Sequence, residues 1–263
     1  KTLNKKAYIV IDNPTSSIIP LMNTFRDNQD YEADMFVNNH EAKEIMDDNT
    51  LLVVVDTNKP SITQCEDLLY MAKMIVVLDH HRQGSDTIRN SVLSYIEPYA
   101  SSASEMVAEI LQYFTEGIRI RNVEADSIYA GIMIDTDNFM QKTGVRTFEA
   151  AAFLRRCGAD VTRVRKLFRE DMNDYKARGE TIRNAELFRG QFAISECPSD
   201  YVDSPTVVGA QAANELLNIV GVKASFVLTE YKGVIYISAR AIDEVNVQII
   251  MERMRGGGHL NMA

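Results

Sequence analysis

Cysteine, positive charge and long apolar runs are all scarce in this sequence of 263 residues. Its three cysteines lie far apart and form no C-x-x-C pair, which argues against a disulfide framework or a structural zinc site and favours reduced thiols in the cytoplasm. The net charge of -9 disfavours a broad grip on duplex nucleic acid, since Lys and Arg supply that affinity. No apolar run approaches the ~20 residues of a membrane helix. We therefore expect a globular chain with a small or short ligand.

Histidine is also rare, with four in the chain, yet His80 and His81 are adjacent. They follow Asp79 and an apolar run at 74–78 that predicts a buried parallel strand. Open α/β sheets place their chemistry at the carboxyl ends of such strands. A lone histidine there is most often structural, but carboxylate and imidazole together are the usual ligands of zinc, manganese or iron. The Asp-His-His stretch therefore predicts a metal site.

Two further acids follow apolar runs. Asp56 comes after 51–55 and Asp135 comes after 130–134, and we predict both runs as strands. A lone acid after a strand is often only a turn former. On one parallel sheet, however, Asp56, Asp79 and Asp135 would converge at a single edge, as a metal cluster requires.

Strand and helix patterns alternate through the first part of the chain. Apolar, β-branched runs separated by helical patterns predict four strands, at 7–11, 51–55, 75–78 and 130–134. Ser102 and Glu105 fit a capping box at the start of a helix. The first amides of that helix could also hold a phosphate, but capping is the simpler explanation. The pattern predicts βαβ units, a parallel sheet and an α/β fold class.

A stretch of mixed charge with few large apolar residues divides the chain. We predict a helical connector at 171–186 between a first domain at 1–170 and a smaller α+β domain at 187–263. Lys232-Gly233, between two apolar runs, is typical of a hairpin turn. The second domain is predicted to contain strands at 191–195, 224–231 and 234–239, a helix at 208–220 and a last helix capped by Asp243.

Two groups in the second domain suit a phosphate ligand. Ser238 and Arg240 leave the hairpin strand, and a guanidinium fork is well suited to phosphate, although such residues are often merely solvated. Gly256, Gly257 and Gly258 let backbone amides approach a ligand closely, and the next residue, His259, can donate a hydrogen bond. Each group alone is weak evidence for a site.

These motifs together resemble those of the DHH phosphoesterase superfamily with its associated C-terminal domain, most closely the bacterial cyclic di-AMP phosphodiesterases of the GdpP type. The matching stretches run from Ala7 to His259 and keep the family's order: Val-Val-Asp-Thr at Asp56, Leu-Asp-His-His at His80, Ile-Asp-Thr-Asp-Asn-Phe at Asp135, then Ser-Ala-Arg and Gly-Gly-Gly-His. The resemblance implies an active site in the cleft between two domains. It implies hydrolysis of cyclic di-AMP to linear pApA by metal-activated water, with two manganese ions, or magnesium or another divalent ion, as cofactor.

The resemblance also implies a role for each candidate residue. Asp56 would bridge the two ions, and His80 and Asp135 would complete the shell of one. Asp79 would orient His80, and His81 would face the phosphate. The distal phosphate and base would be held by Ser238, Arg240, Gly256, Gly257, Gly258 and His259.

One departure from the family is that its first signature, His-x-x-x-Asp-x-Asp, is absent, as is the helix that follows the glycines. We expect a cytoplasmic piece of a longer, membrane-anchored bacterial protein that alone binds at most one metal and turns over negligibly. Three alternatives stay open: an oligoribonuclease acting on linear dinucleotides, a pyrophosphatase, and a nucleotide-binding module without catalysis. A homodimer is compatible with each of them.

Overall fold

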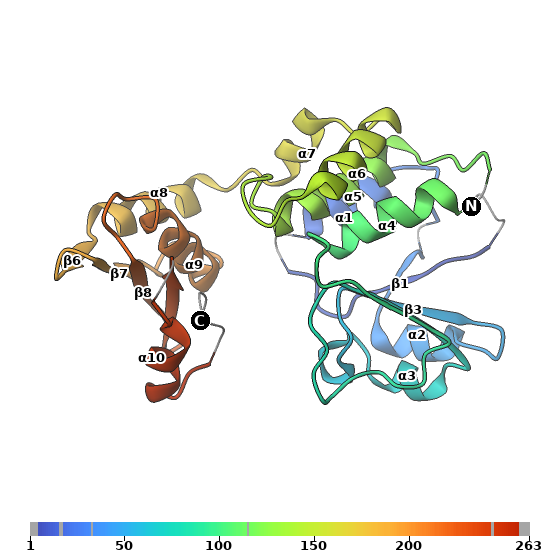
Figure 1. Cartoon of the computed structure of the whole chain (residues 1–263), viewed down its shortest axis with the longest axis horizontal. Helices are drawn as coiled ribbons and strands as arrows, with labels where there is room; N and C mark the ends of the chain where they lie inside the picture. Colours follow the sequence, from blue (N-terminus) through green and yellow to red (C-terminus); the bar gives the residue numbers. More distant parts are fainter. Residues whose placement is uncertain (1–4, 16–17, 33, 115, 243–244, 258–263) are drawn as a thin grey trace. The chain divides into compact units, whose positions relative to one another are not determined.

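A computed structural model describes residues 5–15, 18–32, 34–114, 116–242 and 245–257 of the chain. The chain divides into two compact units, Lys1–Phe168 and Arg169–Ala263 (Figure 1), which are described separately. Within the described residues, no helix is long and apolar enough to cross a membrane.

The strands of the first unit are all parallel. A short pair joins β1 (Ile9–Val10) to β2 (Phe36–Val37), and a three-stranded sheet runs in the order β3 (Leu51–Val55), β4 (Met74–Asp79), β5 (Leu93–Ile96). The register sets Val55 opposite Leu78, so β3 and β4 end side by side. The parallel sheet and the predicted strands at 51–55 and 75–78 are confirmed.

The first unit also contains helices, three of which (α4, α5 and α6) pack against one another (Figure 1). The helices are α1 (Ile19–Arg26), α2 (Asn39–Ile45), the short 3-10 helix η1 (Pro60–Ile62), α3 (Asp67–Met71), α4 (Ala103–Tyr113), α5 (Asn122–Asp135), α6 (Val145–Arg156) and α7 (Val161–Leu167).

The strand predicted at 130–134 is wrong, because these residues form the second half of α5. Ala130, Ile132 and Met133 are buried in the core that α5 shares with α4 and α6, so the helix is apolar on most sides. At Gly131 a Cβ atom would come within 2.1 Å of the Ser104 hydroxyl, which shows how closely α5 and α4 approach. A short apolar run has the same composition in a buried strand and in a buried helix, and periodicity cannot separate them.

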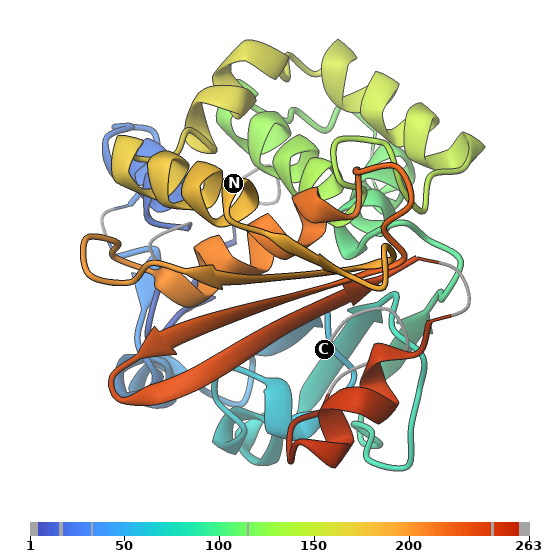
Figure 2. The same ribbon diagram turned by 90° about the vertical axis from the view of Figure 1, so that its left-hand side faces the viewer.

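The second unit is a four-stranded sheet with helices on both faces (Figure 2). The order β6-β7-β8-β9 combines antiparallel outer pairs with a parallel central pair. Figure 2 shows α8 and α9 on one side of this sheet and α10 on the other. The elements are α8 (Met172–Arg183), β6 (Glu186–Phe188), β7 (Phe192–Cys197), α9 (Pro205–Leu216), β8 (Ala224–Tyr231), β9 (Val234–Ala241) and α10 (Val247–Arg253).

One sequence prediction for this unit needs correction, and one is confirmed. Most of the expected helical connector forms α8, in which Ala177 and Thr181 are fully buried on the side facing α9 and β7. The last helix is capped by Asn246, whose side chain accepts from the amide of Ile249, while Asp243 lies outside the described residues. The hairpin turn at Lys232-Gly233 is present, with φ of 53° and 75°.

Candidate active site

The first predicted ligand, Asp56, stands at the end of β3 in a left-handed backbone conformation with φ of 65°. Its amide donates to the carbonyl of Leu78 at 2.9 Å, which extends the β3–β4 ladder by one step. Asp tolerates this conformation better than most residues, yet it is sparsely populated and typical of functional sites. The turn sets the Asp56 carboxylate beside the residues that follow β4.

The His80 imidazole is the centre of the site, with 12% of its side chain exposed. Its Nε2 lies 3.3 Å from Asp56 Oδ1 and 3.7 Å from Asp135 Oδ2. Asp135 reaches this point as the last residue of α5. The three predicted metal ligands therefore come together, although one arrives on a helix end and not on a strand end.

The donor set of the site suits a divalent ion. The Nδ1 atom of His80 lies 3.3 Å from the carbonyl oxygen of Ala100, while Nε2 faces the carboxylates of Asp56 and Asp135, so both ring nitrogens face acceptors. A metal ion at Nε2 would leave the ring proton on Nδ1, where the Ala100 carbonyl can accept it. Asp56, His80 and His81 also offer ligand atoms that all lie within 4.8 Å of one another. One imidazole with carboxylates is the chemistry preferred by manganese, iron or zinc.

Electrostatics at the site follow from this crowding. The hydrogen bond with Asp56 raises the pKa of His80 against the opposing effect of burial, with support from the Ala100 carbonyl. Burial, then the nearby charge of Asp56, raises the pKa of the Asp135 carboxyl. Two acids therefore face one imidazole, and a cation between them would relieve their mutual repulsion.

Asp79 has a different partner from the one expected. Its fully buried carboxylate accepts from His81 through Oδ1, at 2.8 Å from Nδ1 and 3.1 Å from the backbone amide. The prediction that Asp79 orients His80 is therefore wrong, because the Ala100 carbonyl has that position. Asp79 instead fixes the ring of His81, whose side chain is 59% exposed.

Asn58 was not predicted as a site residue. It is almost fully buried, and its Nδ2 donates to Asp79 Oδ2 at 2.5 Å and to the carbonyl of His81 at 3.4 Å. A signal for it existed in the sequence, since a buried carboxylate such as Asp79 needs a donor and Asn58 follows Asp56 by two residues. Asn58 links the end of β3 to the turn that carries both histidines.

In the second unit, Ser238 and Arg240 both lie on β9. The guanidinium of Arg240 is held by neighbouring residues of the second unit. Its Nε donates to Asn214 Oδ1 at 2.7 Å, and an Nη atom donates to the carbonyl of Ala239 at 2.9 Å. Burial lowers the pKa of this guanidinium. The amide of Gly256 donates to the carbonyl of Met251 at 2.8 Å, beyond the end of α10. Gly257 follows it within the described part, whereas Gly258 and His259 lie outside it.

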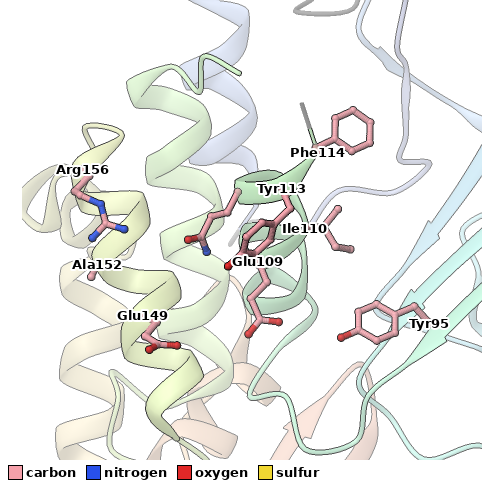
Figure 3. A pocket seen from close by; sticks show the side chains of 9 residues that line it. Tyr95, Glu109, Ile110, Tyr113, Phe114, Glu149, Ala152 and Arg156 are labelled. Atoms are coloured by element: carbon pink, nitrogen blue, oxygen red, sulfur yellow. The ribbon is translucent and has the colours of Figure 1, made fainter. Parts of the chain in front are cut away.

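A separate hollow of about 960 Å³ lies along α4, α6 and β5 (Figure 3) and includes none of the predicted site residues. Its walls carry aromatic side chains together with acids and one arginine. The lining residues are Tyr95, Glu109, Ile110, Gln112, Tyr113, Phe114, Glu149, Ala152 and Arg156. The candidate active site is therefore identified by the side chains that meet at His80, and not by this hollow.

Comparison with known proteins agrees with this geometry. The model of the DHH family, N-terminal domain, matches residues 8–132, and the DHHA1 domain model matches residues 191–263. The chain belongs to the DHH family. The DHH match includes Asp56, Asp79, His80 and His81 and ends just before Asp135.

Relatives of this DHH chain include two proteins named cyclic-di-AMP phosphodiesterase GdpP. The one from Bacillus subtilis (strain 168) is 42% identical over 266 residues, covering 99% of this chain and 40% of the relative. The one from Geobacillus thermodenitrificans is 45% identical over 224 residues, covering 85% and 34%. The cyclic-di-AMP phosphodiesterase PdeA of Listeria monocytogenes is 38% identical over 263 residues, covering 99% and 40%. The chain thus spans about two-fifths of the length of these relatives or less.

One solved structure shares the fold of this DHH chain. It is an exopolyphosphatase-related protein from Bacteroides fragilis, with a TM-score of 0.81 and 20% identity over 99% of this chain and 78% of that one. At this identity the likeness supports the fold alone.

Proposed function

We propose that this chain is the catalytic part of a metal-dependent phosphodiesterase that hydrolyses cyclic di-AMP to linear pApA. The observation that carries the proposal is the meeting of Asp56, His80 and Asp135 around one point, beside a His81 ring fixed by Asp79. The names of the relatives from Bacillus, Geobacillus and Listeria support the choice of substrate.

In this proposal Asp56, His80 and Asp135 hold a divalent ion, with manganese as the expected metal, which when bound supplies positive charge to phosphate oxygens and acidifies water. A probable manganese-dependent inorganic pyrophosphatase from Thermotoga maritima, 30% identical over 152 residues, supports that metal. Asp79 accepts a hydrogen bond from Nδ1 of His81, so that Nε2 of the ring, when it carries a proton, can donate it to the phosphate. Arg240, with Ser238, the glycines 256–258 and His259, binds the distal phosphate and base.

The proposed reaction is hydrolysis of one phosphodiester bond. Water adds to phosphorus, the bond between phosphorus and the 3′ oxygen breaks, and the leaving oxygen takes a proton. His81 is placed to donate that proton or a hydrogen bond to it. One 3′-hydroxyl and one 5′-phosphate form for each bond cut, which gives pApA after one cut.

The proposal extends to a longer parent protein that is anchored in the bacterial membrane, with this chain in the cytoplasm. A relative from the Onion yellows phytoplasma named as a membrane protein fused to ribosomal subunit bL9 is 36% identical over 259 residues. One face of β3 exposes about half of Leu51, Val53 and Val55, which suits a further element that covers it. We expect that element to bring the remaining ligands, so this chain alone binds about one metal.

The test is a matrix of substrates and metals. Cyclic di-AMP, cyclic di-GMP, linear pApA and inorganic pyrophosphate are incubated with and without manganese, using this chain and a form extended upstream through the family's first motif. We expect manganese-dependent cleavage of cyclic di-AMP by the extended form. Preference for pApA would favour an oligoribonuclease, cleavage of pyrophosphate a pyrophosphatase, and binding without turnover a nucleotide-binding module.

A further inference from the structure

Glu105 is a buried acid next to the site that the chemistry described above does not use. It is 1% exposed, and a single oxygen, Oε2, accepts from the Ser101 hydroxyl at 2.5 Å, from the Ser101 amide at 3.3 Å and from the Thr147 hydroxyl at 2.6 Å. The predicted capping box is therefore only half formed. The hydroxyl of Ser102 accepts from the amide of Glu105, but the carboxylate returns to Ser101.

The residue before Ser101 is Ala100, whose carbonyl contacts Nδ1 of His80. Ala100 belongs to a tight turn after β5, in which its amide donates to the carbonyl of Glu97, and Glu97 is in turn paired with the backbone of Asp79. Both ends of this turn are fastened, at Glu97 by the sheet and at Ser101 by Glu105. The direction of the Ala100 carbonyl is therefore set from both sides.

Arg146 offsets the buried charge. It makes two hydrogen bonds of 2.7 Å to Glu109, and it lies 3.9 Å from Glu105 and 3.6 Å from Glu97. A buried carboxylate is costly, and apolar packing could stabilise the same place equally well. A fixed acceptor of three hydrogen bonds, in contrast, supplies a rigid direction that apolar packing does not supply.

We propose that Glu105 is a positioning residue for His80. By holding Ser101 it aims the Ala100 carbonyl at Nδ1, which fixes the ring with Nε2 facing Asp56 and Asp135, the orientation in which Nε2 would bind a metal. The role rests on the proposed function, since it matters for chemistry only if His80 is a metal ligand.

The two neighbouring serines give a matched pair for the test. Ser101→Ala removes a hydroxyl that binds Glu105, whereas Ser102→Ala removes the helix cap and leaves the contacts of Ser101 in place. The first readout is the orientation of the His80 ring, followed by the 1H and 13C ring shifts of histidine-labelled, metal-free chain and assigned with His80→Gln. The second is the affinity for manganese alone, by calorimetry.

We expect wild type and Ser102→Ala to share the same His80 ring shifts, although Ser102→Ala melts at lower temperature. In Ser101→Ala these shifts should move and manganese affinity should fall about 10-fold, with up to about 100-fold in Glu105→Ala, the usual range for the partner of a ligating histidine. Glu105→Gln, which keeps an acceptor oxygen, should restore much of both. Should Glu105→Ala fail to fold, Ser101→Ala decides.

Equal behaviour of the two serine variants, in the His80 ring shifts and in manganese affinity, would overturn the proposal and leave Glu105 as a packing residue. Because the ring shifts are read without metal or substrate, this result is independent of turnover. Failure of the chain and its extended form to cleave cyclic di-AMP would count against the proposed function and not against the alignment of His80.

Discussion

The candidate residues of the two units are held in different ways. In the first unit, Asp56 and Asp135 each contact His80, whose Nδ1 also faces the carbonyl of Ala100. In the second unit, Arg240 contacts Asn214 and the carbonyl of Ala239, neither of which belongs to a candidate site residue. We infer that the first site is a coupled set in which one change disturbs the others, whereas Arg240 contributes locally.

The largest effect is expected for His80→Ala. Loss of the imidazole that contacts both carboxylates should abolish manganese binding and turnover, because water does not replace a histidine ligand without a large loss of affinity. Manganese titration followed by calorimetry, together with turnover by the extended form, measures this. His40→Ala is the control, since His40 is an exposed histidine paired only with Glu44 among the described contacts. Near-normal binding in His80→Ala would remove the basis of the assignment.

The second effect concerns the other unit. Arg240→Ala should weaken binding of cyclic di-AMP by up to about 1.5–3 kcal/mol, the usual value of a charge-assisted hydrogen bond, while the rate at saturation changes little. His259→Ala should act in the same direction. Titration of cyclic di-AMP against the extended form without manganese, where no turnover is expected, measures the affinity, and turnover with manganese measures the rate. Arg183→Ala on α8 is the control. A fall in rate with unchanged affinity would show that Arg240 of the second unit does not act in substrate binding alone.

Asp79→Asn should have a smaller effect than His80→Ala, of about 10- to 100-fold. The hydrogen bonds place this effect on His81, so the rate should fall while manganese affinity stays close to wild type. The family resemblance alone predicts the opposite, a loss of affinity through His80. Rate and affinity measured in one variant therefore decide which histidine Asp79 serves, and a selective loss of affinity would contradict the structure.

The strand ends could be predicted from sequence because they are local. An apolar run followed by an acid identifies Asp56 and the Asp-His-His turn within a few residues. The hydrogen-bond partners of site residues could not be predicted in this way, because they are distant in sequence. The Ala100 carbonyl lies 20 residues after His80, and Thr147 lies 42 residues after Glu105. Which side of a ring or carboxylate faces a distant loop depends on packing, and a linear pattern carries little information about packing.

The helix that carries Asp135 shows the same limit. Its run Ala-Gly-Ile-Met-Ile was predicted as a strand, and only the packing of α5 against α4 and α6 makes it a helix. The prediction of a metal ligand at Asp135 was nevertheless useful, because either element would end at this acid. Composition identified the ligand type, and tertiary contacts selected the element.

A fourth prediction compares a helix glycine from each unit. Gly131→Ala in α5 should destabilise the chain by about 1–3 kcal/mol, since the new Cβ would overlap Ser104 in a packed core. Gly179→Ala in α8, where no atom lies within 4 Å of the Cβ position, should stabilise by about 0.5–1 kcal/mol. Urea unfolding of both variants measures this. Equal effects would mean that α5 does not approach α4 as closely as described.

The smallest expected effect is a pH dependence of the metal-free first unit. The pKa of His80 is raised above 6.5 in the folded state, so its pairing with Asp56 stabilises fully below that value and is lost as the pH rises through the folded pKa. The raised pKa of Asp135 acts in the same direction, since its buried carboxyl is favoured in the neutral form. The effect is modest because the Asp56 side chain is 56% exposed and solvent screens the pair.

Manganese should reverse this trend, because it binds the neutral imidazole and the ionised carboxylates, so its affinity rises over the same pH range. The measurement is the difference in melting temperature between wild type and His80→Gln, from pH 6.5 upward, with and without manganese. Taking the difference removes groups that titrate elsewhere in the chain. We expect the wild-type advantage to shrink with pH in the metal-free protein and to grow with manganese. Parallel slopes under both conditions would mean that the ion does not bind where His80 pairs with Asp56.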